Sequence, residues 1–420
     1  MAISPLIINS NRNRLEPLHH TLSNGLRLVH LPTTSPVAYA GFVVDAGTRD
    51  EQADEYGLAH FVEHMIFKGT TKRKAWQIIN RMETIGADTN AYTTKEETFF
   101  YCVFLKEHYN RAFEWLSDLV CNPIFPTHEI NREVDVILDE INSYEDMPSE
   151  LIFDDFEDLL YKGHALGHDI LGTKESLSHF GTQECLSFTK RLYTFDNMVY
   201  FTMGNMDFDK IIAQAEKLLP PTSIGVREGK RIAPEPILPI TVTKEKEIHQ
   251  THILMGGRSI SLFDKRRAAL FLLNNLLGGP GLNSRLNETL REKLGLVYNV
   301  ESNLSSYTDT GIASVYFACD PKNSTRAKRL VKRELLKVCE QPLKERQLQA
   351  LKKQTIGQIG VANDNQENVF LGLGKSFLRY NRYDSLEKVR KRLESVTSEQ
   401  LIEVANVFYS PEQLFTLVYS

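Results

Sequence analysis

The sequence lacks any apolar run that approaches the roughly 20 residues of a membrane-spanning helix. It also lacks an excess of basic residues, because the formal net charge is −5, whereas nucleic-acid binding requires a basic face. Residues 1–20 contain neither the long apolar core of a signal peptide nor the arginine content of a transit peptide. These absences argue against a membrane or a nucleic acid as a partner.

Cysteine is scarce and shows no pairing pattern. The sequence has 5 cysteines, an odd number, and none lies in a Cys-x-x-Cys pair. They are Cys102, Cys121, Cys185, Cys319 and Cys339. Reduced and mostly buried thiols are the simplest interpretation, and such thiols are typical of cytosolic proteins. We therefore expect a cytoplasmic protein.

The remaining composition is that of an ordinary globular protein, 42% hydrophobic and 25% charged. A chain of 420 residues exceeds the size at which one core stops growing, so two or more domains are expected. Residues 219–240 carry five prolines, which neither continue a helix nor donate to a sheet. The sequence predicts domains at 1–220 and 241–420, joined by a linker at 221–240.

The two predicted domains show the same succession of patterns. In each, strand-like runs precede a helical run, and a second helix, another strand-like run and a charged helical segment follow. His64 and Asn275 lie 211 positions apart, and Gly86 and Gly295 lie 209 apart. This near-constant offset predicts duplication of one α+β domain of about 200 residues.

The duplication provides an internal control for metal chemistry. Where the first domain carries the motif His-Phe-Val-Glu-His, the second carries Leu270 or Phe271 and the pair Asn274 and Asn275. We therefore expect a metal in the first domain alone.

Residues 54–69 predict a helix that begins with acidic residues and ends at a glycine. His60 and His64 are four residues apart, so they lie on one face, where neighbouring Cβ atoms are about 5–6 Å apart. Two neutral imidazoles at that spacing reach one Zn²⁺ ion. Glu63 borders the same face and can accept a proton from an activated water, as the reversed zinc motif HxxEH requires.

A pair of histidines at this spacing also arises by chance, and it recurs at His164 and His168. Glycines surround that second pair and no carboxylate lies between its members, so we expect loop histidines there. His249 and His252 are three apart on a predicted strand, where they would point to opposite faces, and no role is assigned to them.

A catalytic zinc ion has three protein ligands and one open position. The third ligand is expected in the first domain, where the predicted helix at residues 126–141 offers five carboxylates. They are Glu129, Glu133, Asp135, Asp139 and Glu140. Glu133 and Glu140 lie two turns apart on one stripe, but spacing alone does not choose among the five.

The chain contains HFVEHMIFKGT, NAYTTKEETFFYC and EINREVDVILDEI. Together these strings resemble the pitrilysin and insulinase superfamily of zinc peptidases, most of all its short members of the mitochondrial processing peptidase β-subunit type and their bacterial relatives. The likeness continues through LLGGPGLNSRLNETLREKLGLVYNV, so it covers nearly the whole chain. It implies two domains, each a mainly antiparallel sheet packed with helices, that form the halves of a clamshell around a cavity.

The resemblance also implies roles for particular residues. The third zinc ligand falls on Glu140, 76 positions after the second histidine, and Glu133 supports and orients the ligands. Asn90 and Ala91 fall on an edge strand along which an extended substrate binds through its main chain.

Arg291 and Tyr298 match an arginine–tyrosine pair that closes over the scissile bond in this family. Charged donors there would stabilise the developing oxyanion. Some short members divide the zinc motif and this pair between two chains, whereas this sequence holds both. The resemblance therefore favours a homodimer of one self-sufficient chain.

These observations predict a zinc metalloendopeptidase that hydrolyses peptides or unfolded segments in an enclosed chamber. The competing hypothesis is a non-catalytic structural or regulatory subunit of a peptidase-like or respiratory complex, although such relatives lose part of the zinc motif. Residues 133–158 form a dense acidic stretch. If it faces the cavity, its negative potential predicts a preference for basic peptides.

Overall fold

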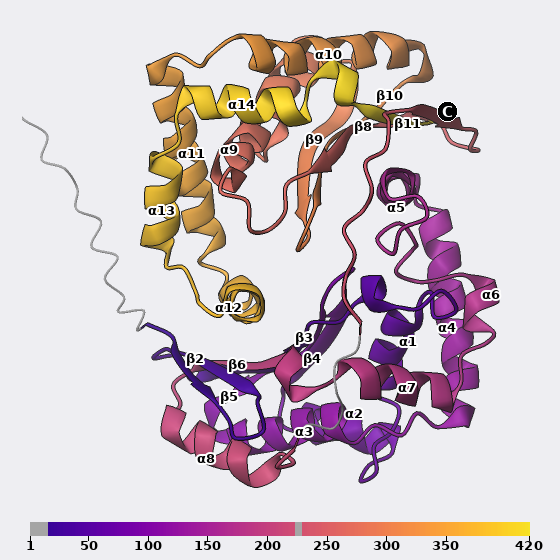
Figure 1. Ribbon diagram of the computed structural model, residues 1–420, viewed down its shortest axis with the longest axis vertical. Helices are drawn as coiled ribbons and strands as arrows, with labels where there is room; N and C mark the ends of the chain where they lie inside the picture. Colours follow the sequence, from indigo (N-terminus) through magenta and orange to yellow (C-terminus); the bar gives the residue numbers. More distant parts are fainter. Residues whose placement is uncertain (1–15, 223–228) are drawn as a thin grey trace, which may run out of the picture.

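The computed structural model describes residues 16–222 and 229–420. Within these ranges it contains two sheets, each accompanied by helices (Figure 1). Part of the N-terminal segment discussed above (1–15) and part of the predicted linker (223–228) lie outside the described residues. Among the helices of the described ranges, none combines the length and apolar character needed to cross a bilayer.

The first half of the chain forms a six-stranded sheet in the order β1-β2-β6-β3-β5-β4. Its strands are β1 (Leu18–Thr21), β2 (Arg27–Pro32), β3 (Val37–Val44), β4 (Asp88–Thr93), β5 (Thr98–Leu105) and β6 (Met198–Gly204). Its helices are α1 (Leu58–Met65), α2 (Ala75–Glu83), α3 (Tyr109–Cys121), α4 (Thr127–Glu145), α5 (Pro148–Leu160), α6 (Lys174–Leu177), α7 (Thr182–Leu192) and α8 (Phe208–Leu218).

The second half forms a five-stranded sheet in the order β7-β11-β8-β10-β9. Its strands are β7 (Thr241–Lys244), β8 (Thr251–Ser259), β9 (Val297–Ser306), β10 (Gly311–Cys319) and β11 (Phe415–Tyr419). Its helices are α9 (Arg267–Gly278), α10 (Ser324–Glu340), α11 (Glu345–Ala362), α12 (Gln366–Tyr380), α13 (Leu386–Glu394) and α14 (Ser398–Phe408).

The two sheets share one topology. When β1 is set aside, the order β2-β6-β3-β5-β4 corresponds strand by strand to β7-β11-β8-β10-β9. The parallel pairs, β2 with β6 and β7 with β11, occupy corresponding places, and the other pairings are antiparallel. The predicted α+β fold with mainly antiparallel sheets is confirmed, and the shared order supports the predicted duplication.

Alternation along the strands sends side chains to two separate apolar layers of the first sheet. On β3, Phe42 and Val44 join the layer that contains α1 and α3, whereas Val43 joins the opposite layer. Because both faces are apolar, both must be covered by other elements.

The second face of each sheet is covered by a helix from the other half of the chain. Helix α12 packs on the first sheet, where Val369, Phe370 and Leu373 cluster with Val43 and Phe201. In return, α5 packs on the second sheet against β8 and β11 (Figure 1). The ranges 1–220 and 241–420 thus each contain one sheet. The core around each sheet, however, includes a helix from the other range, α12 for the first sheet and α5 for the second.

Candidate metal centre

Helix α1 carries the histidine motif, and it is shorter than the sequence predicts. It spans Leu58–Met65 and not residues 54–69. Gly57 precedes it with φ of 96°, a left-handed conformation that glycine adopts readily and that a right-handed helix excludes. Asp54 and Glu55 therefore lie outside the helix, so the predicted acidic first turn was wrong.

A carboxylate from outside the helix caps its N-terminus instead. Glu51 accepts hydrogen bonds from the backbone N–H groups of Ala59, at 2.7 Å, and Gly57, at 3.0 Å. His168 Nε2 lies 2.8 Å from Glu51 Oε2, and its ring stacks on Tyr56 with centroids 4.0 Å apart. Burial lowers the pKa of His168 to about 4, so the ring is uncharged at neutral pH. His168 lies in a loop as predicted. Its contact with Glu51, which caps α1, was not predicted from the sequence.

Three side chains converge beside α1. His60 and His64 have ring centroids 4.6 Å apart. Glu140 reaches them from α4, with Oε2 3.9 Å from His60 Nε2 and 3.8 Å from His64 Nε2. One possible ligand atom from each residue lies within 4.8 Å of the other two. Within residues 16–222 and 229–420, no other group of three or more histidine, cysteine or acidic side chains comes as close together. Zinc bonds of about 2.0–2.2 Å to nitrogen and oxygen are compatible with these separations, so the donor set fits the ion.

Glu133 lies next to this group, but both of its oxygens have partners. Oε1 accepts a hydrogen bond from His64 Nδ1 at 2.9 Å, and Oε2 lies 2.6 Å from Lys68 Nζ. The contact orients the imidazole and leaves His64 Nε2 available to a metal. Of the five carboxylates that spacing left open, Glu140 is therefore the one whose position suits a ligand. Lys68, which fixes Glu133, was not identified from the sequence.

The protonation of the two histidines differs. Burial and the nearby His64 lower the pKa of His60 to about 3, so its ring is neutral and offers a lone pair. Burial alone would lower the pKa of His64, but the hydrogen bond to Glu133 and the charges of Glu63 and Glu140 outweigh it and raise the pKa. A cation at Nε2 competes with that proton, so metal binding here should release protons.

Glu63 precedes the second histidine and is buried, with 8% of its surface exposed. The hydroxyl of Thr93, at the end of β4, donates to Glu63 Oε2 at 2.7 Å. Burial raises the pKa of Glu63, although the hydrogen bond from Thr93 and the charge of His64 oppose that rise. A carboxylate with a raised pKa beside a metal group suits general base chemistry.

Asn90 and Ala91 lie on β4, the edge strand of the first sheet. They pair with Tyr101 and Phe100 of β5 on one side, and no strand of the described residues pairs with β4 on its other side. Helix α1 packs beside β4, so this free edge belongs to the same region as the metal group. The N–H of Ala91 donates to Asn90 Oδ1 at 2.9 Å, so an extended peptide that pairs with this edge would replace that side-chain contact by a main-chain one.

Arg291 and Tyr298 make no described contact with the metal group. Arg291 lies in a short π-helix (Asn287–Glu292), with 45% of its side chain exposed. Tyr298 lies near the start of β9 and is 75% exposed. Any part that they play in catalysis therefore requires a bound substrate or a closer approach of the two halves.

The corresponding place in the second half holds uncharged groups. Asn275, the counterpart of His64, donates its Nδ2 to Thr355 Oγ1 at 2.7 Å and to Gln358 Oε1 at 2.9 Å. Both partners lie on α11, the counterpart of α4. An amide and a hydroxyl that already satisfy one another offer no ligand set for zinc.

In the acidic stretch at residues 133–158, some carboxylates pair with lysines, whereas Asp154 has a raised pKa. Asp155 and Glu157 each pair with a lysine. For Asp154, burial and neighbouring carboxylates raise the pKa to about 7. Burial, Asp154 and Glu140 together raise the pKa of Tyr144 on α4.

Family models match two parts of the chain. Residues 28–174 match the insulinase family (peptidase family M16), and residues 180–355 match the inactive domain of M16 peptidases. The first match contains the candidate ligands, and the second contains the half without them.

Curated relatives extend along nearly the whole chain. An uncharacterized zinc protease of Rickettsia felis is 32% identical over 391 residues, covering 93% of this chain and 94% of that protein. One of Bacillus subtilis is 30% identical over 405 residues, covering 95% and 97%. One of Mycobacterium leprae is 33% identical over 395 residues, covering 92% and 88%.

Solved structures share the fold. A crystal structure described as a peptidase M16 inactive domain from Pseudomonas fluorescens has a TM-score of 0.89 and 19% identity, covering 96% of this chain and 98% of that chain. A protease from Helicobacter pylori has a TM-score of 0.89 and 20% identity, covering 97% and 100%. The predicted relationship to the pitrilysin and insulinase peptidases is confirmed.

Proposed function

This chain belongs to the insulinase family of peptidases, peptidase family M16, and from that premise we propose that it is a zinc-dependent endopeptidase. One observation carries the proposal: His60, His64 and Glu140 place three ligand atoms within 4.8 Å of one another. Glu63 lies on α1, between the two histidines. A ligand set with a buried carboxylate next to it is what metal-assisted hydrolysis requires.

The chain's own residues divide the chemistry between them. Zinc, when bound by His60, His64 and Glu140, supplies Lewis acidity, which makes water a nucleophile at neutral pH. Glu63 accepts the proton of the attacking water on its carboxylate and delivers it to the leaving amine. Glu133 holds His64 in the orientation that presents Nε2.

We further propose that the substrate is an extended peptide that pairs with the free edge of β4. Main-chain pairing at Asn90 and Ala91 tolerates many side chains, and the carboxylates of α5 add a preference for basic ones. Arg291 and Tyr298 would close over the bound peptide and stabilise the oxyanion in an enclosed chamber. A homodimer in the cytoplasm is the setting that the sequence favours.

Metal content and peptidase activity, measured on the same preparation, test the proposal. The purified full-length chain should contain zinc and cleave a pool of unstructured peptides, lose that activity to a chelator, and regain it with zinc. Glu63→Gln should keep its zinc while turnover drops by about 10² to 10⁴. A chain that binds zinc but cleaves nothing in the pool would instead support the non-catalytic subunit.

A further inference from the structure

The hydroxyl of Thr93 connects the substrate strand to the proposed base. Thr93 is the last residue of β4, and its Oγ1 lies 2.7 Å from Glu63 Oε2 on α1. Glu63 is buried, so its carboxylate cannot rotate freely without losing this hydrogen bond. One oxygen of the carboxylate is therefore fixed from the strand.

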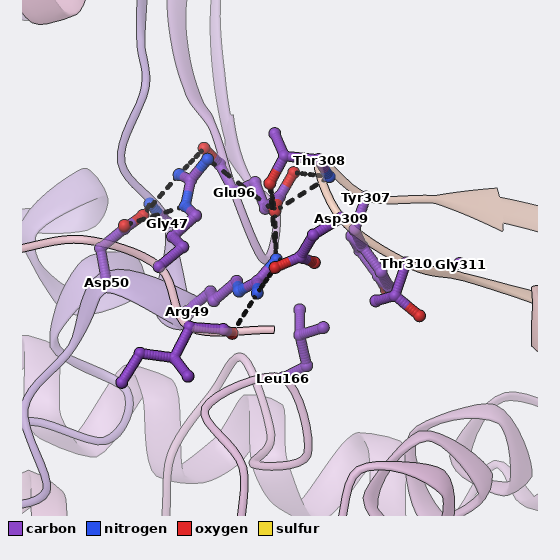
Figure 2. Close-up of polar contacts among 12 residues, drawn as sticks. Gly47, Arg49, Asp50, Glu96, Leu166, Tyr307, Thr308, Asp309, Thr310 and Gly311 are labelled. Atoms are coloured by element: carbon purple, nitrogen blue, oxygen red, sulfur yellow. Dashed lines mark hydrogen bonds and ion pairs between the residues drawn. The ribbon is translucent and has the colours of Figure 1, made fainter. Parts of the chain in front are cut away.

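The turn that follows β4 is fixed by buried charges, which keeps the end of the strand in place. Residues 95–97 are charged, yet each is at most 4% exposed. Glu96 accepts hydrogen bonds from Arg49 and from the hydroxyl of Thr308, both at 2.6 Å. Figure 2 shows Thr308 and Asp309, in the turn between β9 and β10, meeting Glu96 and Arg49. The second half thus holds this turn of the first half directly.

The two neighbours of Glu96 in this turn, Lys95 and Glu97, are held by other parts of the chain. Glu97 pairs with Arg379 of α12 at 2.8 Å and also with Lys375. Lys95 donates to the backbone carbonyl of His168 and lies 3.6 Å from Glu157 of α5. With three consecutive side chains fixed, the backbone that leads into the turn has little freedom to move.

The second half contains the equivalent contact without a charged partner. Asn274 occupies the position of Glu63, and its Oδ1 accepts a hydrogen bond from the hydroxyl of Ser302. Ser302 lies on β9, the counterpart of β4. A hydroxyl that joins the helix to the edge strand is therefore common to both halves, whereas the carboxylate is present in the first half alone. The duplicated contact supplies a control for a purely structural effect.

We propose that Thr93 is a positioning residue that holds Glu63 Oε2, so that the carboxylate faces a peptide bound along β4. The inference rests on the proposed peptidase function. Asn90 and Ala91 belong to the same strand as Thr93. The strand that would bind the peptide therefore also fixes the position of the proposed base, Glu63. A displacement of about 1 Å can cost about 10² in rate, and the loss should fall on kcat because the peptide-binding edge is unchanged.

The test compares three variants of the full-length chain. Thr93→Val keeps the shape and removes the hydroxyl, Thr93→Ser restores the hydroxyl, and Ser302→Ala removes the equivalent contact in the second half. Zinc content, thermal stability, kcat and KM are measured for each. We expect Thr93→Val to bind zinc with KM within about threefold of the unmodified chain and kcat lowered by about 10- to 100-fold. Thr93→Ser should recover most of kcat, and Ser302→Ala should keep it.

Two outcomes would overturn the inference without touching the proposed function. In one, the unmodified chain is an active zinc peptidase and Thr93→Val retains its kcat. In the other, Ser302→Ala loses as much kcat as Thr93→Val, which would mean that both act through general stability. If Thr93→Val does not fold, Thr93→Ala, which only deletes atoms, replaces it against the same controls. An unmodified chain without zinc-dependent cleavage would remove the proposed function, and this inference with it.

Discussion

The ring of Phe370 stacks on the ring of Phe201, with centroids 4.4 Å apart and planes inclined by 24°. Phe370 lies on α12 of the second half and Phe201 on β6 of the first, and both are fully buried. One turn further along α12, a Cβ added to Gly374 would lie 2.8 Å from the same ring. Helix α12 therefore approaches the first sheet closely enough to form part of its core, as α5 does for the second sheet.

Phe370→Ala should destabilise the first half of the chain, although the residue belongs to the second. Removing a buried phenylalanine side chain costs about 3–5 kcal/mol, and here the cavity would open against β6. Hydrogen exchange should show lost protection in β2, β3 and β6. Val361→Ala, at a position that is 78% exposed, is the control. Loss of protection confined to residues 241–420 would contradict the assignment of α12 to the first core.

Zinc retention should distinguish the two carboxylates of α4. Glu140→Gln should lose most of its zinc, because it removes a charged ligand. Glu133→Gln should retain zinc with an affinity weakened by about 10- to 100-fold, because it disturbs only the partner of His64 Nδ1. Asp139→Asn, on an exposed neighbour in the same helix, should bind zinc normally. If metal analysis gives the opposite order, the ligand role passes to Glu133.

Local patterns predicted the parts of the site that lie within one helix. His60, Glu63 and His64 follow from the four-residue spacing, because that spacing fixes side-chain direction in a helix. Glu140 did not follow from spacing, since five carboxylates share its helix. The family resemblance selected it, and the contacts of Glu133 with His64 and Lys68 explain the choice.

Contacts between distant elements were not predictable in the same way. Glu51 and His168 are 117 residues apart in sequence, and the hydrogen bond between them depends on how a loop folds back on α1. Likewise, the apolar face of α12 marks it as a packed helix, but no periodicity shows which sheet it covers. The predicted helix start at residue 54 is wrong because the positive φ of Gly57 excludes this residue from the interior of a right-handed helix.

The buried histidine His30 should make stability depend on pH. Burial lowers its pKa to about 4 from an ordinary 6.5, and its Nδ1 lies 2.8 Å from Thr202 Oγ1. Between these pH values the unfolded state binds a proton that the folded state does not, so the free energy of unfolding falls as pH is lowered. At about 1.4 kcal/mol per pKa unit, the full effect is about 3 kcal/mol.

His30→Asn, which retains a polar group near Thr202, should remove this component of the pH dependence. The stability difference between the unmodified chain and the variant should then shrink as pH falls from 6.5 to 4, as measured by denaturant unfolding. His249→Asn, at an exposed histidine, is the control. A difference that stays constant over this range would show that His30 titrates normally in the folded protein.

The response to salt should reveal whether the carboxylates of α5 act on substrates. If Asp154 and its neighbours face the bound peptide, they attract lysine- and arginine-rich sequences, and added salt screens that attraction as the Debye length shrinks from about 10 Å at 0.1 M to about 3 Å at 1 M. At pH 8, kcat/KM for a basic peptide should therefore fall with salt far more than for a neutral peptide of equal length.

Because burial and nearby carboxylates raise the pKa of Asp154 to about 7, the preference for the basic peptide should also weaken below that pH. Asp154→Asn should flatten the salt dependence, whereas Asp155→Asn, whose carboxylate already pairs with Lys244 at 2.6 Å, should leave it in place. Equal salt dependence for both peptides would remove the electrostatic component and leave main-chain pairing at β4 as the basis of substrate binding.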